Sequence, residues 1–346
     1  MKVILSVLLF YFALGIDTAF SQAPFYQGKT ISVVLGGPPG GSADLRTKAV
    51  TSFLRKHIPG NPTIIVQYMQ AGGGRQAANH IYGKARPDGL EIGSMGAALV
   101  ANAILGETGV QYDIDKFIYL GTPDSANHYL FLTSREAKLT DLEKLRSAPN
   151  VRIGAQSVGH PIYITGRLFA YVIGIKGATF VTGFSGPEID LALMRGEIDA
   201  RVGTAETMIR RSPEWIEKGL VDVHAGIEIP KGRKTPHFTN VPELESLAKS
   251  ARERRILEMF RAFRLSGQTF FLPPGTPKER IEILREAMRK TLNDPEFAAE
   301  YRKLVGDDPT PVMPEALEKA IKELPRESEV IGVFNKLGGS GPLPPR

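Results

Sequence analysis

The sequence contains no cysteine, one tryptophan and six histidines in 346 residues. Without cysteine, the fold can hold no disulfide, no lipid can be attached through a thiol, and no cysteine-containing zinc set can form. The histidines are far apart, with no i,i+4 pair and no acidic partner motif, so the sequence predicts neither a metal nor a cofactor. Long apolar runs are also missing after the first residues: no later segment offers the roughly 18 apolar residues that a membrane helix requires.

Concentrated positive charge is missing as well, although the net charge is +6. The basic residues alternate with glutamates, as in residues 252–255 and 278–280, which is typical of solvated helix faces. Because no basic tract is interleaved with aromatic residues, the sequence disfavours nucleic-acid binding. A mild positive field still favours small anionic ligands.

The first 23 residues have the pattern of an export signal. Lys2 precedes an apolar run that ends near Ile16, and small residues lead to Ala23 before Pro24. We expect cleavage after about Ala23 and a periplasmic protein that is free rather than tethered. The remaining length usually divides into two domains rather than one core.

Short β-branched runs alternate with helical stretches along the chain, which predicts an α/β fold with crossover helices. We expect lobe I at residues 24–128 and 240–346 and lobe II at 129–239, with a mostly helical final third. The Gly/Pro-rich tail from Gly338 has a disordered composition. The expected strands are residues 31–35, 63–67, 90–93, 117–120, 129–133, 151–155, 179–181, 198–202 and 221–225.

One glycine-rich turn, residues 36–44, follows the first expected strand and opens a helix pattern. Such a turn leaves backbone N–H groups unpaired at the positive end of a helix dipole, which suits an anion. It lacks the lysine and hydroxyl of a nucleoside-triphosphate loop and the glycine spacing of a dinucleotide loop. A tight turn capped by Ser42 or Asp44 explains the pattern equally well.

Other short polar turns follow other strands. In lobe I these are residues 72–74 and 93–96, and in lobe II they are residues 156–160, 183–188 and 203–206. Because ligand crevices of open α/β sheets lie beyond the carboxyl ends of the strands, we expect these turns to form two facing jaws. His160 either contacts the ligand or hydrogen-bonds at a helix start, and its position favours the helix start.

A catalytic alternative is an exported hydrolase or transferase that uses Ser94 or Ser185 as its nucleophile. The turn around Ser185 closes one residue too early for a nucleophile elbow, and the turn around Ser94 lacks the first glycine. This alternative requires a base histidine and an orienting acid within hydrogen-bond reach of the serine.

An ordered series of motifs resembles the Bug family, the periplasmic solute-binding receptors of tripartite tricarboxylate transporters. The series covers most of the chain from about Phe25 onward, and it is specific because the motifs occur in order. Its members are Tyr26-Gln27-Gly28-Lys29-Thr30, Pro38-Pro39-Gly40-Gly41-Ser42-Ala43-Asp44, Ala71-Gly72-Gly73-Gly74, Ala85-Arg86-Pro87-Asp88-Gly89-Leu90, Tyr112-Asp113 to Phe117, and Pro273-Pro274-Gly275-Thr276-Pro277.

The resemblance implies a two-lobed Venus-flytrap fold, each lobe a mixed or parallel sheet flanked by helices. It implies no catalysis: a monomeric receptor closes on a small organic carboxylate and delivers it to a small and a large membrane subunit. Carried over by position, the implied ligand-binding residues are Gly37, Gly40, Gly41, Ser42, Asp44, Ser94, Met95, Gly96, Ala97, Gln156, Ser157, His160, Phe184, Ser185, Gly186, Thr204 and Glu206.

The chain departs from the family pattern in the second jaw. The family's Ser/Gly-rich loop becomes residues 156–161 here, and its Tyr-Lys-Gly becomes Gly183-Phe184-Ser185-Gly186. In the first jaw, Thr47-Lys48 stands where relatives usually have Ala-Arg, which is a minor change on a helix face. Losing a cation and gaining an aromatic favours an aromatic or partly apolar monocarboxylate. A same-fold receptor that serves a signalling partner remains a second alternative.

Overall fold

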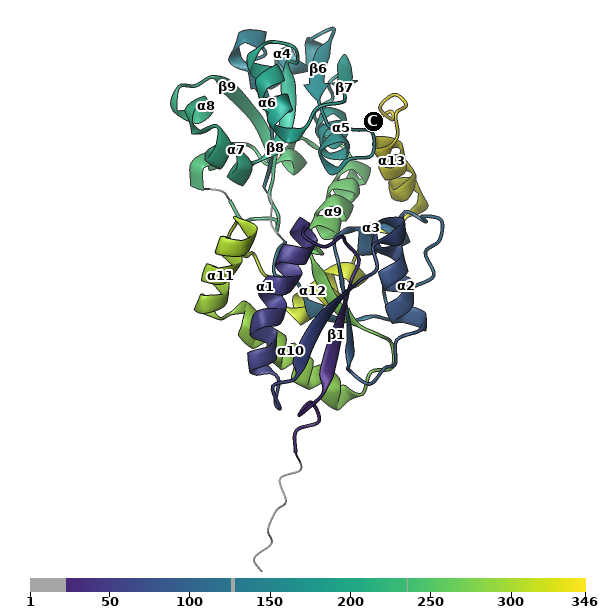
Figure 1. Cartoon of the computed structure of the whole chain (residues 1–346). Helices are drawn as coiled ribbons and strands as arrows, with labels where there is room; N and C mark the ends of the chain where they lie inside the picture. Colours follow the sequence, from purple (N-terminus) through teal and green to yellow (C-terminus); the bar gives the residue numbers. More distant parts are fainter. Residues whose placement is uncertain (1–22, 126–127, 235) are drawn as a thin grey trace, which may run out of the picture.

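Two five-stranded sheets, one in each lobe, form the framework of the protein (Figure 1). The computed structural model describes residues 23–125, 128–234 and 236–346. The expected export signal therefore lies outside the described residues except for Ala23. In the described part of the chain no helix is both long and apolar enough to cross a membrane.

Lobe I is built on a sheet with the order β2-β1-β3-β10-β4, in which β1, β2 and β3 are parallel and β10 is antiparallel to both of its neighbours. Helices α1, α10 and α11 pack on one face, and α2, α3 and α12 pack on the other. The strands are β1 (Thr30–Leu35), β2 (Thr63–Tyr68), β3 (Glu91–Met95), β4 (Ile118–Gly121) and β10 (Thr269–Leu272). The helices are α1 (Ser42–His57), η1 (Ala71–Gly74), α2 (Arg75–Gly83), α3 (Ala98–Ile104), α10 (Lys278–Leu292), α11 (Pro295–Val305) and α12 (Pro314–Lys322).

Lobe II has the order β7-β6-β8-β5-β9, with β5 antiparallel to β8 and β9 and the other pairs parallel. Helices α6, α7 and α8 cover one face and α5 covers the other. The strands are β5 (Tyr129–Ser134), β6 (Val151–Gly154), β7 (Ala178–Val181), β8 (Ala200–Thr204) and β9 (Val221–Ile227). The helices are η2 (Arg135–Ala137), α4 (Leu142–Ser147), α5 (Pro161–Ile173), α6 (Gly186–Met194), α7 (Ala205–Arg211), α8 (Pro213–Glu217), η3 (Pro236–Phe238) and η4 (Leu244–Leu247).

The predicted α/β fold of two mixed sheets flanked by helices is confirmed, and each of the nine expected strands lies within a few residues of an observed one. Strand β10 was not expected from the sequence. It enters lobe I from the C-terminal part of the chain, between β3 and β4, which makes this lobe discontinuous. The exact limits of the two lobes remain a prediction.

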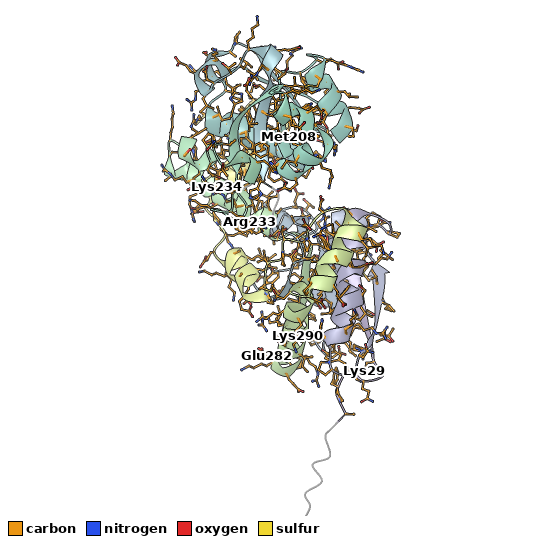
Figure 2. All side chains as sticks on the ribbon, turned by 90° about the vertical axis from the view of Figure 1, so that its left-hand side faces the viewer. Lys29, Met208, Arg233, Lys234, Glu282 and Lys290 are labelled. Atoms are coloured by element: carbon orange, nitrogen blue, oxygen red, sulfur yellow. The ribbon has the colours of Figure 1, made fainter. Side chains whose placement is uncertain are left out.

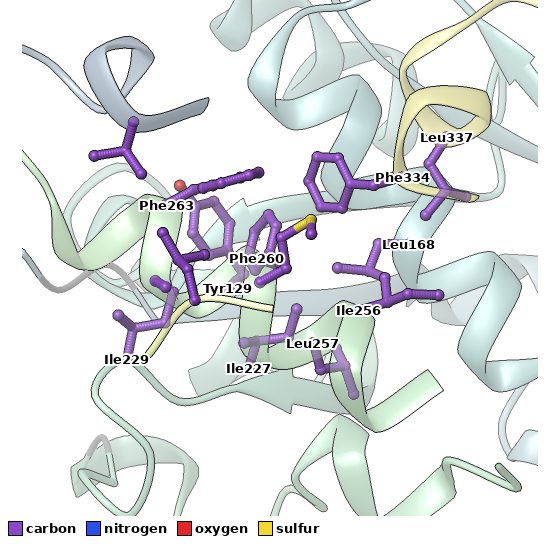
Figure 3. Packing of buried hydrophobic residues seen from close by; sticks show 14 of the residues in the cluster. Tyr129, Leu168, Ile227, Ile229, Ile256, Leu257, Phe260, Phe263, Phe334 and Leu337 are labelled. Carbon is purple, nitrogen blue, oxygen red and sulfur yellow. The ribbon is translucent and has the colours of Figure 1, made fainter. Parts of the chain in front are cut away.

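Helix α9 (Ala251–Leu265) lies between the two lobes (Figure 1). It packs against α3 and α12 of lobe I and against η4 and α13 (Ser328–Gly338). Phe260 and Phe263 belong to a buried hydrophobic cluster that also contains Met95 of lobe I and Phe131 of lobe II. Figure 3 shows Phe260 and Phe263 packed with Tyr129 and Phe334. One hydrophobic core is therefore shared by both lobes.

The C-terminal tail is ordered, so the expectation of disorder from Gly338 is wrong. The guanidinium of Arg167, on α5, donates to the carbonyls of Gly341 and Pro342 at 2.7 and 3.2 Å. At the end of the tail, Arg346 forms two hydrogen bonds to the carboxylate of Glu253, at 2.7 and 3.0 Å. The sequence predicted disorder because this segment is rich in glycine and proline, whereas its order comes from contacts with distant side chains.

Candidate functional site

The turn between β1 and α1 presents backbone N–H groups at the start of a long helix. Gly41 is the N-cap residue, and no side chain accepts a hydrogen bond at that cap. The N–H groups of Ser42 and Ala43 therefore have no acceptor among the described residues. Gly40 has a φ of 75°, in the left-handed region that glycine adopts most easily. The turn has the free donors and the helix dipole that an anion requires.

Asp44, a buried residue in the first turn of α1, stabilises this turn. Its side chain is fully buried, and it accepts hydrogen bonds from the Gly40 N–H at 2.7 Å, Lys48 Nζ at 2.8 Å and the Tyr68 hydroxyl at 3.0 Å. Burial raises the pKa of Asp44, but these hydrogen bonds outweigh burial, so the pKa is lowered. The carboxylate is therefore ionised and already partnered. Of the two caps expected from the sequence, Asp44 holds the turn and Ser42 does not.

The three glycine-rich turns of lobe I meet at one place. A Cβ at Gly74 would lie 2.7 Å from the carbonyl oxygen of Gly36 and 3.0 Å from Cε of Met95. Gly74 also has a φ of 91°, so only glycine fits there without strain. The turns after β1, β2 and β3 are thus in direct contact at the carboxyl end of the sheet.

Ser94 is fully buried within a polar cluster beneath these turns. Its hydroxyl lies 3.0 Å from Thr47 Oγ1 and accepts a hydrogen bond from Gln268 Nε2 at 2.9 Å. No histidine is among the hydrogen-bond partners of Ser94 or Ser185 in the described part of the chain. The backbone N–H of Ser185 instead donates to Glu188, at 2.6 Å, at the start of α6. The catalytic alternative therefore lacks the base that it requires.

Two turns of lobe II are joined after β6 and β7. The Gly183 N–H donates to the Gln156 carbonyl at 2.7 Å. The Oε1 atom of the Gln156 side chain is buried and has no hydrogen-bond partner among the described residues. His160 is the N-cap of α5, and its Nδ1 accepts from the Ile162 N–H at 3.2 Å. The prediction that His160 forms a hydrogen bond at the start of a helix is confirmed.

The third turn of lobe II follows β8. The hydroxyl of Thr204 caps α7 by accepting from the Thr207 N–H at 3.2 Å. Glu206 lies 3.1 Å from Nδ1 of His128, and its other carboxylate oxygen is buried without a partner in the described chain. The hydrogen bond with Glu206 raises the pKa of His128 despite burial, which acts in the opposite direction. His128 Nε2 also contacts the Arg233 carbonyl, so His128 links Glu206 to the segment that follows β9.

A cavity of about 530 Å³ lies between the lobes, next to His128 and Glu206. Arg46 and Tyr301 line it from lobe I, and Glu206 and Arg210 line it from lobe II. Figure 2 shows Arg233 and Lys234, which also line it, at the level where the lobes meet. Arg210 spans the two lobes by contacting Asp307 and donating to the Gly306 carbonyl at 2.9 Å. Basic residues thus surround the cavity together with a smaller number of carboxylates.

Not every predicted site residue faces this cavity. Among them only Glu206 is part of its described lining, while Thr204 lines a small pocket inside lobe II. Ser94 and Met95 are buried, and Ser42, Ser157 and Ser185 are exposed. The predicted residues thus form two groups, one at the sheet end of each lobe. The remaining members, Gly37, Gly40, Gly41, Asp44, Gly96, Ala97, Gln156, His160, Phe184 and Gly186, lie in these same turns.

A larger hollow, about 1150 Å³, lies elsewhere, between α5, Glu253 of α9 and the C-terminal tail. None of the predicted site residues is part of its described lining. The described residues also contain no group of three or more histidine and acidic side chains that could hold a metal ion.

No protein-family model and no curated protein matches this sequence. Solved structures do match its fold. A TctC solute-binding protein from Polaromonas has a TM-score of 0.69 at 18% identity, covering 90% of this chain and 99% of its own. The periplasmic binding protein BugD has a TM-score of 0.54 at 18% identity, with 91% and 99% covered. MatC from Rhodopseudomonas palustris, solved with bound malate, has a TM-score of 0.52 at 19% identity, with 90% and 99% covered. The chain therefore has the two-lobed fold of periplasmic binding proteins.

Proposed function

We propose that this protein is a periplasmic receptor that binds a small organic carboxylate between its lobes for uptake by a tripartite tricarboxylate-type transporter. The observation that carries the proposal is the meeting of three glycine-rich turns beside the unpartnered N–H groups of Ser42 and Ala43. A helix N-terminus with free donors favours a negative group. The fold shared with TctC, BugD and malate-bound MatC supports the same role.

Binding follows from fixed main-chain donors. An anion at a helix N-terminus is stabilised by about 0.3–1 kcal/mol at an exposed site and by up to about 2 kcal/mol at a partly buried one. Closure of the lobes adds contacts from the turns of lobe II, which include Gln156 and Glu206. Asp44 holds the first turn in its conformation and does not itself contact the ligand.

Delivery to the membrane requires a partner. The small and large membrane subunits of the transporter are the proposed partners, and the receptor works as a monomer without a cofactor. Release into the periplasm requires removal of residues 1–23. Mass spectrometry of the protein isolated from the periplasmic fraction tests the cleavage after Ala23.

A thermal-shift screen of the ligand-free protein tests the binding function. Malate, adipate and benzoate serve as acids, with the neutral analogue benzamide as the control. At about 100-fold its Kd, a true ligand stabilises the folded state by about 2.7 kcal/mol, which raises Tm by several degrees. Native mass spectrometry first establishes that the sample is free of cargo. If none of the acids in a wider series of aliphatic and aromatic carboxylates raises Tm, the proposal fails.

A further inference from the structure

Arg264 differs from Arg252, Arg255 and Arg261 of the same helix, because it forms no ion pair with any described residue. The neighbouring Arg261 forms ion pairs with Glu243 and Glu245 at 2.5 and 2.6 Å. Arg264 forms no such pair in the described chain, and its Nε atom is buried without a hydrogen-bond partner. Buried polar atoms in proteins are nearly always hydrogen-bonded. Arg264 therefore presents donors that nothing in the described chain uses.

Two aromatic rings hold the Arg264 side chain in place. Its guanidinium carbon lies 5.5 Å from the ring centroid of Tyr129 and 5.1 Å from that of Phe260. The two rings pack edge to face with centroids 5.6 Å apart, and Figure 3 shows them side by side. Cation–π contacts of this kind hold the guanidinium in place while using none of its N–H groups as hydrogen-bond donors. The dipole of α9 favours a cation at this end of the helix but supplies no partner for the N–H donors.

The residues around Arg264 belong to both lobes. Gln268, four residues further along the chain, donates to Ser94 at the end of β3 in lobe I. In lobe II, Tyr129 pairs with Thr204 at the end of β8. Burial and, to a smaller extent, the positive charge of Arg264 lower the pKa of His160. Tyr129, under the guanidinium, is the first residue of β5. The position is therefore at the junction of the lobes.

We propose that Arg264 binds a carboxylate group of the solute and is a specificity-determining residue of this receptor. The inference rests on the proposed function. Arg264 pairs through its free guanidinium edge, in the two-pronged geometry that arginine and carboxylate share. Closure of the lobes removes water from this charge, so a ligand without an acidic group at this point would leave it buried and unpaired.

Calorimetric titration with malate, adipate and benzoate tests the assignment on wild type, Arg264→Gln and Arg264→Lys. The matched control is Arg255→Gln, because Arg255 lies on the same helix in exposed pairs with Glu258 and Glu327. We expect Arg264→Gln to weaken the binding of the acid by about 10- to 100-fold. Arg264→Lys keeps the positive charge but not the planar guanidinium, so its affinity should fall by an intermediate amount. The affinity of Arg255→Gln should stay within about twofold of wild type.

NMR titration of His160 separates binding from a structural role. In wild type the bound acid raises the pKa of His160, because an anion then neutralises the neighbouring charge; in Arg264→Gln it does not. Equal affinities of wild type and Arg264→Gln for the acid overturn the assignment and leave the receptor function standing. Failure of wild type to bind any acid rejects the receptor function itself. If Arg264→Gln does not fold, Arg264→Lys decides. An affinity equal to that of wild type, together with a His160 pKa that does not change when the acid binds, overturns the assignment.

Discussion

The side-chain amide of Gln268 donates a hydrogen bond to the hydroxyl of Ser94 at 2.9 Å, joining residues 174 positions apart. This contact connects the turn between α9 and β10 to the end of β3. It also uses the hydroxyl that the catalytic alternative needs. Ser94 is thus a structural residue of the candidate site.

Replacement of Ser94 by alanine should lower the free energy of unfolding by about 1–3 kcal/mol, because it leaves Gln268 and Thr47 without a buried partner. Urea denaturation measures the change. A serine-directed fluorophosphonate should leave Ser94 unlabelled in the folded wild type. Stoichiometric labelling of Ser94 or Ser185 would revive the catalytic alternative.

Replacement of Asp44 by asparagine should destabilise the first turn by about 1–3 kcal/mol, because the neutral amide loses charge-assisted hydrogen bonds from Lys48 and Gly40. Ligand affinity should fall only modestly, since the carboxylate holds the turn rather than the ligand. Complete loss of binding in a folded variant would instead give Asp44 a direct role.

The stabilising effect of Asp44 should depend on pH. Because the folded state lowers the pKa of this carboxyl from 3.8, its stabilisation is present above that value and is lost as the pH falls through the lowered pKa. The stability difference between wild type and Asp44→Asn should therefore be constant near neutrality and shrink in acid. Urea denaturation from pH 7 down to pH 3 measures it, and a difference that grows in acid contradicts the assignment.

His128 should titrate in the opposite sense. Its pKa is raised from 6.5, chiefly by the hydrogen bond with Glu206, so the stabilisation is fully present below pH 6.5 and is lost as the pH rises through the higher folded value. In Glu206→Gln, NMR should find a lower pKa for His128 and less extra stability in mild acid. An unchanged pKa would mean that the pair does not form in solution.

Replacement of Arg346 by alanine should cost about 1–3 kcal/mol, because it leaves the carboxylate of Glu253, which is 1% exposed, without its cation. The matched control is Arg302→Ala. Its pair with Asp308 is exposed on both sides, so the change should stay below about 1 kcal/mol. Equal effects in thermal unfolding would show that the tail is not docked.

The sequence predicts the sheets of this protein better than its site. Nine strands could be found because buried β-branched runs are local signals, whereas β10 is a run of four residues whose partners lie far away in the chain. The glycine-rich turns were visible by composition, but their meeting depends on the close approach of Gly36 and Gly74. Arg264 was hidden among alternating charges on α9, and only the fold shows that it forms no ion pair with the residues that the structure describes.

The hydrophobic cluster around α9 has a consequence for how the protein unfolds. Since Phe260 and Phe263 pack in the same core as Met95 and Phe131, neither half of the molecule can lose its packing without exposing apolar surface of the other. The chain should therefore melt in a single cooperative calorimetric transition rather than in two steps, even though its sheets are separate.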